Sequence, residues 1–529
     1  MIAQRAIESF LASPGDSYEW IKDAPRADLI RELQEYPYHT DFKTDPRLCQ
    51  LACYLLGISL PTFCFFLDMR LGKTKLMLDV FSYYRAETKS LAPHRPFRGL
   101  ILVPQLLHME PWREQVPIHA PHLSVQLLEG SSGDRLESLD QGGADLYVLN
   151  YQGLVHLLSS KENQRPARQS WEKKKQDRRT LHPDFHKIAW VGERFSYLVL
   201  DESTTVKNRT SLTFEICDGL SQIIPYRYAL TGTPFGRSPE DLWAQFYLID
   251  RGETLGKTIT FFREAYFTKK KRYWGGYDYI FKEALTDTLH RRIQNRSIRY
   301  LLEECEDLPQ KIYDPIRLTW DPEAFGYYER ELSAFRNEAI SAIQRENHFM
   351  AMRQLTAGFC RIKNEDGDEE IITFSQNPKL DALIELLQGL DLNRKMVVFH
   401  FFIPSGDLLH ARLKKEKIGA VRIWSETKNR PTLLNQFRTD DKTRVLIVNE
   451  RIGSMALDLQ CANYITFYDL PVSPITRAQA EARCRGPQQR SPSIIHDLMY
   501  KGSVDEKIHA FIKAGHDLHQ AIMDGTESL

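Results

Sequence analysis

Long apolar runs are absent from this 529-residue sequence. A helix that crosses a bilayer needs roughly 18 or more consecutive apolar residues, and no stretch approaches that length. The first residues, MIAQRAIESF, include a glutamate and lack the apolar core of a secretory signal. We therefore expect an intracellular protein that has no membrane partner.

Metal-ligating and disulfide patterns are absent as well. The eight cysteines are scattered, with no C-x-x-C pair and no histidine nearby at ligand spacing, so neither a zinc site nor a disulfide framework is expected. An acidic run at 364–368 lacks the spacing of a calcium-binding loop. We interpret it as the turn of a hairpin formed by residues 359–362 and 371–374.

Net charge is also lacking, because 70 Lys and Arg residues balance 70 Asp and Glu residues. A nucleic-acid partner would therefore be met by local patches rather than by an overall field. The basic stretch 161–180 is interpreted as a solvated insertion, with a phosphate-backbone contact as the alternative. The patch at 269–272, next to Tyr273 and Trp274, is a candidate DNA contact, with a solvated face as the equal alternative.

Hydrophobic residues make up 42% of the chain and charged residues 26%, which is typical of a folded soluble protein. Short apolar strands alternate with helical patterns in two series, which predicts an α/β fold with parallel sheets in two lobes. The expected strands lie at 63–67, 100–103, 146–149, 197–200 and 228–230, then at 396–399, 421–424, 445–448, 465–468 and 494–498. The predicted organisation is an extension at 1–45, a first lobe at 46–250, a mainly helical linking or protruding region at 251–378, and a second lobe with C-terminal helices at 379–529.

Residues 67–78, LDMRLGKTKLML, resemble the end of a phosphate-binding loop. A loop that enters a helix offers backbone N–H groups to phosphate, while its lysine pairs the outer phosphates and its threonine ligates magnesium. Gly72, Lys73 and Thr74 supply that minimum. The full motif requires glycine where the chain has Leu67, and Arg70 stands where such loops often have glycine, so this stretch alone leaves the nucleotide site open.

Asp201 and Glu202 directly follow an expected buried strand. The carboxyl ends of strands are where open α/β sheets bind ligands. Nucleotide hydrolysis needs such a pair, one carboxylate to hold magnesium and the other to orient the attacking water. The alternative is that the two carboxylates simply begin an ordinary exposed loop. The phosphate-loop residues Gly72, Lys73 and Thr74 in the same chain make this alternative weaker.

A series of short motifs over about residues 45–510 resembles, in the same order, the Swi/Snf-type branch of superfamily 2 ATPases, which are duplex-DNA translocases. The matching stretches are PRLCQ (46–50), LDMRLGKT (67–74), LVP (102–104) with Trp112, LNY (149–151), DEST (201–204) with Lys207 and Asn208, LTGTP (230–234) with DLW (241–243), LPQK (308–311), VVF (397–399), IGSMALDL (452–459) and QAEARCRGPQ (479–488). The compact length suits a bacterial or viral member, acting in the cytoplasm of a bacterial or phage-infected cell.

The resemblance implies two RecA-like lobes that bind and hydrolyse ATP with Mg²⁺. The implied ATP-binding residues are Gln50, Arg70, Leu71, Gly72, Lys73 and Thr74, with Thr74 and Asp201 on the metal. Glu202 would activate water, and Arg483 and Arg485 would neutralise charge on the transferred phosphoryl group.

Two further sets of residues follow from the resemblance. Coupling of hydrolysis to DNA is assigned to Thr231, Gly232, Thr233, Gly453 and Asp458. Contact with nucleic acid is assigned to Asn150, Tyr151, Lys207, Lys270 and Lys271. Trp112 is assigned to packing.

Two departures from the family pattern bear on the second lobe. Arg483 and Arg485 are two residues apart where the family has three, so a surface arginine is the alternative for Arg485. Ala456 and Asp458 stand where the family often has Gly and Asn, which puts the tightness of coupling in question. The expected function is that of a monomeric DNA-dependent ATPase that translocates on double-stranded DNA and remodels or displaces bound complexes. A strand-separating DNA or RNA helicase and a nucleic-acid-binding scaffold with a degenerate ATPase are the alternatives.

Overall fold

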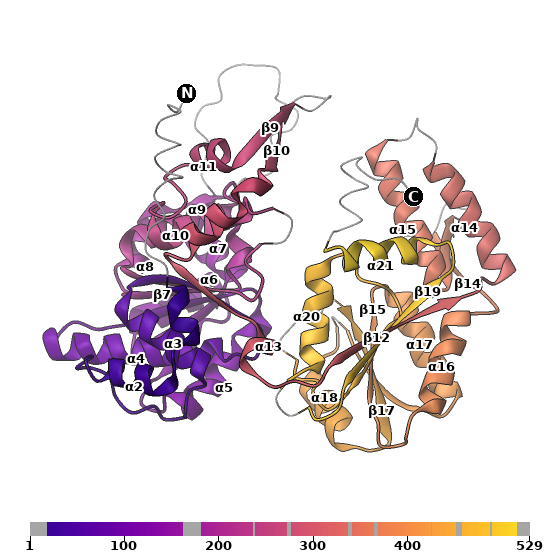
Figure 1. Cartoon of the computed structure of the whole chain (residues 1–529), viewed down its shortest axis with the longest axis horizontal. Coiled ribbons are helices and arrows are strands. Elements are labelled where there is room, and N and C mark those ends of the chain that lie inside the picture. The colour runs from indigo at the N-terminus through magenta and orange to yellow at the C-terminus, as the bar shows by residue number, and fades with distance from the viewer. Residues whose placement is uncertain are drawn as a thin grey trace. The chain divides into compact units, whose positions relative to one another are not determined.

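The computed structural model divides the chain into two compact units, Met1–Cys305 and Glu306–Leu529. The residues that it describes are 18–161, 181–235, 238–271, 277–336, 341–363, 369–424, 426–450, 457–486 and 489–515. Figure 1 shows that each unit is a sheet with helices on both faces. Within the described ranges, no helix is long and apolar enough to cross a membrane.

The first unit is built on a seven-stranded sheet in the order β11-β1-β8-β7-β2-β4-β3. All of its pairings are parallel, and its central strands β1, β2, β4 and β7 are near-continuous apolar runs because helices cover both faces. The strands are β1 (Thr62–Leu67), β2 (Gly99–Val103), β3 (Val125–Leu127), β4 (Leu146–Asn150), β7 (Tyr197–Asp201), β8 (Tyr226–Leu230) and β11 (Ser297–Tyr300). All five strands predicted for the first series are confirmed.

Helices and two small hairpins complete the first unit. The α-helices are α2 (Arg26–Leu33), α3 (Leu48–Ser59), α4 (Lys73–Leu91), α5 (Glu110–His119), α6 (Ser132–Gln141), α7 (Tyr151–Leu158), α8 (Phe185–Gly192), α9 (Leu212–Ile223), α10 (Asp241–Asp250), α11 (Ile259–Tyr266), α12 (Thr286–Ile293) and α13 (Leu302–Cys305). The 3₁₀ turns are η1 (Glu19–Asp23), η2 (Leu106–His108), η3 (Ser203–Val206) and η4 (Glu283–Leu285). The hairpins pair β5 (Ser159–Lys161) with β6 (Leu181–Pro183) and β9 (Phe267–Lys271) with β10 (Tyr277–Phe281).

The second unit has a six-stranded parallel sheet in the order β12-β19-β18-β15-β17-β16. Its strands are β12 (Lys311–Leu318), β15 (Met396–His400), β16 (Gly419–Ile423), β17 (Thr443–Asn449), β18 (Tyr464–Phe467) and β19 (Ser493–Tyr500). Its helices are α14 (Pro322–Phe335), α15 (Ala342–Thr356), α16 (Pro378–Gly389), α17 (Ile403–Lys415), α18 (Arg430–Thr439), α20 (Pro474–Cys484) and α21 (Val504–Lys513). The predicted hairpin forms from β13 (Phe359–Lys363) and β14 (Glu369–Thr373), and its turn lies outside the described residues.

The predicted linking region 251–378 is divided between the two units, with residues 251–305 in the first unit and residues 306–378 in the second. β11 extends the first sheet by pairing with β1, and β12 extends the second sheet by pairing with β19. Both are edge strands. β11 is only four residues long and β12 exposes much of its length, so neither gives the apolar run by which the central strands were predicted.

The carboxyl ends of parallel strands meet at one edge of a sheet. In the first unit β1, β8 and β7 are neighbours in that order. The loops that follow them begin at residues 68, 231 and 202, and therefore lie side by side. This edge holds the phosphate-loop motif, the acidic pair and the TGTP motif.

Candidate nucleotide site

The loop between β1 and α4 is shaped by two residues with left-handed backbone conformation. Gly72 has φ +74° and caps the N-terminus of α4, and Arg70 has φ +69°. Only glycine adopts such angles without steric cost. The family's usual glycine at position 70 is thus explained by the backbone angle, which this chain imposes on an arginine.

Lys73 begins α4, and its ammonium group reaches the ends of β1 and β7. Its Nζ donates to the carbonyl of Leu67 at 3.0 Å and lies 3.7 Å from Oε1 of Glu202. A lysine at the first turn of a helix that starts from a left-handed glycine places its charge beside the helix N-terminus. The predicted proximity of Lys73 to the acidic pair is present in the structure.

The acidic pair stands at the end of β7. Asp201 is the last strand residue, and Glu202 turns the chain with φ +48° into a 3₁₀ turn. Asp201 Oδ2 accepts a hydrogen bond from the indole Nε1 of Trp112 at 3.3 Å, and the hydroxyl of Tyr151 donates to the Asp201 carbonyl at 3.0 Å. Trp112, assigned to packing from the sequence, is indeed buried, and it also orients the carboxylate.

Burial raises the pKa of the Asp201 carboxyl to about 6, and the charge of Glu202 adds to the shift. Lys73 and the bond from Trp112 act in the opposite direction. The carboxylates of Asp201 and Glu202 therefore share the single ammonium group of Lys73 in a partly buried site. A site with excess negative charge suits a divalent cation, which lowers the pKa of the carboxyl that binds it.

The acidic pair is joined to the TGTP motif by Thr231. This fully buried threonine donates from Oγ1 to Oε2 of Glu202 at 3.2 Å, and its Oγ1 accepts from the backbone N–H of Thr233 at 3.2 Å. Gly232 lies close to the β1 backbone, since an added Cβ would stand 3.3 Å from the Leu67 carbonyl. Of the predicted coupling residues, Thr231 thus contacts the acidic pair and Gly232 lies next to the start of the loop that follows β1.

A second link between the acidic pair's loop and the TGTP motif runs through Gln245, a residue that was not predicted from the sequence. The hydroxyl of Ser203 donates to Gln245 Oε1 at 2.7 Å, and Gln245 Nε2 donates to the carbonyl of Pro234 at 2.6 Å. Gln245 lies on α10 and is fully buried. The only sequence signal is a polar residue inside an otherwise apolar helix, because the contact joins segments 42 residues apart.

Gln50, predicted to bind adenine, is used here to hold the phosphate loop. Its Oε1 accepts from the Arg47 N–H at 2.9 Å, which caps α3. Its Nε2 donates to the carbonyls of Leu71 at 3.0 Å and Gly72 at 3.3 Å. Arg47 adds a bond from its guanidinium to the carbonyl of Arg70. The adenine contact stays a prediction, and it requires Gln50 to exchange these bonds.

The predicted nucleic-acid residues fall into two groups. Asn150 and Tyr151 are buried, at 6% and 2% exposure, and the Tyr151 hydroxyl is engaged by Asp201, which argues against a phosphate contact by either side chain. Lys207 is exposed and pairs with Asp241 at 3.1 Å. Lys270 and Lys271 are exposed on β9 and remain candidates.

The predicted residues of the second unit lie on and near α20. Arg483 is on the helix, and its carbonyl accepts from the Leu459 N–H at 3.0 Å. Arg485 follows the helix and is buried, with its Nη2 donating to the Pro309 carbonyl at 2.7 Å. The alternative of a surface arginine at 485 is therefore wrong. Asp458 is exposed, and Gly453 lies outside the described residues.

Two parallel-sheet units, one with a phosphate loop and an acidic pair at a single sheet edge, define a nucleotide-binding α/β protein of the helicase class. A model of the SNF2-related domain matches residues 63–366, more than half of the chain, and a model of the helicase conserved C-terminal domain matches residues 378–486. The chain belongs to the SNF2-related family, and the resemblance inferred from the sequence is confirmed.

Relatives of the chain include two bacterial proteins. It is 22% identical over 450 residues to an uncharacterized ATP-dependent helicase of Mycoplasma genitalium, covering 83% of this chain and 38% of that protein. It is 22% identical over 471 residues to a putative ATP-dependent helicase/translocase of Bacillus subtilis, covering 86% of this chain and 46% of that protein. The chain thus spans less than half the length of these relatives.

A solved SWI2/SNF2 ATPase core from Sulfolobus solfataricus in complex with dsDNA is 19% identical, with a TM-score of 0.38, over 92% of this chain and 95% of that one.

Proposed function

We propose that the chain is an ATP hydrolase that is stimulated by duplex DNA, translocates along it, and thereby remodels or displaces bound complexes. The observation that carries this proposal is the approach of Lys73 Nζ to Glu202 Oε1 at 3.7 Å, beside Asp201. A lysine suited to binding phosphate and a carboxylate suited to activating water thus lie at the same edge of the sheet. Membership of the SNF2-related family supports the same reaction.

The residues present fit ATP and Mg²⁺. The left-handed loop ends in the N-terminus of a 19-residue helix, whose N–H groups and dipole favour phosphate. Thr74 and Asp201 would hold the cation, which neutralises charge on the β- and γ-phosphate oxygens. Lys73 would pair the outer phosphates, exchanging its bond to the Leu67 carbonyl for one to a phosphate oxygen.

Glu202 would take the proton of the attacking water. Thr231 holds one of its carboxylate oxygens, so that the other, Oε1, is the oxygen directed toward Lys73. Because Thr231 also binds the backbone of Thr233, a change in the TGTP motif would alter the position of the base. This is the route by which we expect Thr231, Gly232 and Thr233, with Gly453 and Asp458, to couple hydrolysis to DNA.

Arg483 and Arg485 are proposed to supply positive charge to the phosphoryl group in the transition state. Both belong to the second unit, whereas the phosphate loop belongs to the first. Hydrolysis would then depend on the two units acting together. Arg485 is buried and donates to the Pro309 carbonyl, so Arg483 is the preferred candidate.

The β9–β10 hairpin is the proposed DNA contact of the first unit. Lys269, Lys270 and Lys271 are exposed in succession on β9, and the Lys269 ammonium lies 3.7 Å from the centre of the Tyr277 ring on β10. Basic side chains with an aromatic neighbour suit a phosphate backbone, which is bound without reading sequence. Lys207 is proposed as a further nucleic-acid contact, for which it would release Asp241.

A strand-separating DNA or RNA helicase is the second candidate, because it needs the same ATP site. No described feature favours it over translocation. A scaffold with a degenerate ATPase is disfavoured, since Lys73, Asp201 and Glu202 are all in place.

ATP turnover measured with no nucleic acid, duplex DNA, single-stranded DNA and RNA distinguishes these functions. We expect selective stimulation by duplex DNA, falling steeply with salt if phosphate contacts dominate. Displacement of a third strand from a triplex, without separation of the duplex, would support translocation. Stimulation by single strands with duplex unwinding would overturn the translocation proposal in favour of a helicase, and no turnover in any condition would leave only the scaffold.

A further inference from the structure

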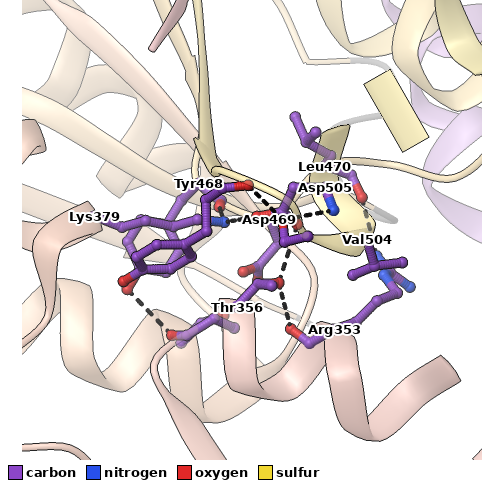
Figure 2. Close-up of polar contacts among 12 residues, drawn as sticks. Arg353, Thr356, Lys379, Tyr468, Asp469, Leu470, Val504 and Asp505 are labelled. Carbon is purple, nitrogen blue, oxygen red and sulfur yellow. Dashed lines mark hydrogen bonds and ion pairs between the residues drawn. The ribbon is translucent and has the colours of Figure 1, made fainter. Parts of the chain in front are cut away.

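Tyr468, Asp469 and Leu470 are the first three of the six residues, 468–473, that connect the end of β18 to α20. This segment sets the direction in which the chain enters the helix that carries Arg483. All three residues are almost fully buried. Each is held by side chains or backbone of a different part of the second unit, as Figure 2 shows for the contacts of Lys379 and Arg353.

Tyr468 is fixed at both ends. Its N–H donates to the Phe399 carbonyl on β15 at 3.0 Å, and its own carbonyl accepts from Lys379 Nζ at 3.0 Å. Its hydroxyl donates to the Ala357 carbonyl at 3.1 Å and accepts from Asn377 Nδ2 at 2.9 Å. The tyrosine therefore ties the segment to α15 and α16 as well as to the sheet.

The next two residues are held from elsewhere. Asp469 Oδ2 accepts from the N–H groups of Phe401 at 2.8 Å and Phe402 at 3.3 Å, and from Ser405 Oγ at 2.6 Å. The carbonyl of Leu470 accepts from Arg353 Nη2 on α15 at 3.0 Å. The backbone of the segment is thus bound at successive residues before α20 begins.

The lysine that binds Tyr468 is part of a buried ion pair. Lys379 Nζ lies 2.8 Å from Oδ2 of Asp505 on α21, with side-chain exposures of 0% and 3%. Oδ1 of Asp505 accepts from Thr356 Oγ1 at 3.0 Å. The ion pair and Thr356 together thus link α15, α16 and α21 next to the Tyr468 carbonyl (Figure 2).

Stability alone is a weak reason for such a pair. The cost of removing two ions from water roughly cancels their attraction, and replacing both by apolar side chains of similar volume is often neutral or stabilising. What an apolar pair cannot supply is a directed hydrogen bond to the Tyr468 carbonyl. The ammonium group of Lys379 specifies where that carbonyl lies, and hence where the segment that leads to α20 begins.

We propose that Lys379, together with Asp505 and Thr356, is a positioning group that sets α20 so that Arg483 reaches the transferred phosphoryl group. This inference rests on the proposed ATP hydrolysis. A misplacement of about 1 Å in a group that acts on the transition state can cost about a hundredfold in rate. Loss of the group should lower kcat and leave KM for ATP unchanged, because the arginine acts in the transition state.

The principal variant is the double substitution Lys379→Met with Asp505→Leu, which replaces both charged side chains by apolar side chains of similar shape. We expect kcat to fall about ten- to hundredfold at an unchanged KM for ATP and an unchanged or higher Tm. Hydrogen exchange should quicken in residues 468–484 and stay the same in the rest of the unit. A folded double variant with wild-type kcat would overturn the proposal.

Lys395 offers a matched control in the same unit. It is a buried lysine whose Nζ donates to the carbonyls of Asp440 at 2.8 Å and Thr443 at 3.1 Å, on segments that do not lead to α20. Lys395→Met should lower Tm and leave kcat of the folded protein unchanged. An equal loss of kcat in this variant would show that any buried lysine has the same effect, and would contradict the positioning role.

A milder pair of variants tests the same contact without removing a charge. Thr356→Val loses the hydroxyl that binds Asp505, whereas Thr356→Ser retains it. We expect a drop in kcat of severalfold for Thr356→Val and near wild-type kcat for Thr356→Ser. Equal kcat in both variants would count against the proposal.

The hydrogen-exchange result separates this inference from the proposed function. If the wild-type protein hydrolyses no ATP with any nucleic acid, the proposed function fails, and exchange in residues 468–484 still decides whether the ion pair positions α20. If the wild-type protein is active but the double variant matches it in both kcat and exchange, the positioning proposal alone fails.

Discussion

The two units treat buried charge in opposite ways. In the first unit, Asp201 and Glu202 share the ammonium of Lys73 at a half-buried strand edge, and burial raises the pKa of Asp201 to about 6. In the second unit, Lys379 and Asp505 pair directly and are almost fully buried. The comparison teaches that a sheet edge with excess negative charge is suited to binding a cation and phosphates, whereas a neutralised ion pair between two helices is suited to holding the backbone in place.

Removal of one lysine from each unit tests this comparison with the largest expected effect. Lys379→Met leaves Asp505 buried without its partner, which should lower the free energy of unfolding by about 3–5 kcal/mol. Lys73→Met removes a longer contact, and the Glu202 carboxylate that it leaves behind is more accessible to water, so this substitution should lower the free energy of unfolding less than Lys379→Met does. Urea unfolding, with each unit followed by hydrogen exchange, measures both. Equal destabilisation by the two substitutions would contradict the distinction.

The indole that orients Asp201 is the next test. Trp112→Phe keeps most of the buried ring and loses the N–H that donates to Asp201. A hydrogen bond to a charged group contributes about 1.5–3 kcal/mol, so ATP turnover should fall about tenfold or more. Trp320→Phe is the control, because its indole donates to the Lys501 carbonyl in the second unit at 2.9 Å. Loss of turnover in the control but not in Trp112→Phe would refute the role of the indole.

The pH dependence of stability should differ between two buried carboxyls. Burial raises the pKa of Asp79 to about 6 against the opposing charge of Lys75. Burial also acts to raise the pKa of Asp497, but hydrogen bonds from His509 and Arg477 and the charge of Arg477 outweigh it and lower the pKa. Asp79 therefore binds a proton more tightly in the folded protein than in the unfolded chain, whereas Asp497 binds one less tightly in the folded protein.

Because the two pKa values shift in opposite directions, Asp79 makes the free energy of unfolding fall with rising pH, and Asp497 makes it rise. The contribution of Asp79 favours folding at low pH and is lost as pH rises from about 4 to about 6, by at most about 1.4 kcal/mol per pH unit. The contribution of Asp497 is present above the unfolded pKa and is lost as pH falls through the folded value. Asp79→Asn should flatten the first slope, and Asp497→Asn should change the profile only in the acid range. Denaturant titrations at several pH values test this, and an unchanged slope in Asp79→Asn would contradict the assignment.

The smallest effect is expected at the phosphate loop. Arg70 has φ +69°, which costs a non-glycine residue about 1 kcal/mol, while glycine loses about 0.5–1 kcal/mol more entropy on folding. Arg70→Gly should therefore change the free energy of unfolding by no more than about 0.5 kcal/mol and leave turnover intact. Thermal unfolding and an ATPase assay measure this. A loss of more than about 1 kcal/mol would show that the side chain itself supports the loop.

The central strands and the motifs of the candidate site could be predicted because their signals are local. Asp201 and Glu202 follow an apolar run, and Gly72, Lys73 and Thr74 follow another, so parallel pairing brought the two motifs to one edge. The exact partners could not be predicted in this way. Trp112 and Asp201 are 89 residues apart, and nothing in the neighbouring sequence of either indicates the contact.

The boundary between the units and the burial of Arg485 were beyond the sequence for a related reason. Edge strands such as β11 and β12 are short or exposed, so their apolar pattern is weak. An arginine after a helix is usually solvated, and the Pro309 carbonyl that binds Arg485 in the buried position is 176 residues away in the sequence.

Binding and turnover of ATP by Glu202→Gln, beside the wild-type protein and Lys73→Ala at saturating duplex DNA, test the central claim most directly. Glu202→Gln should bind Mg²⁺ and ATP nearly as tightly as the wild-type protein and hydrolyse it about a thousandfold more slowly, whereas Lys73→Ala should lose binding. Wild-type turnover by Glu202→Gln, or a wild-type protein that binds no ATP, would contradict the account.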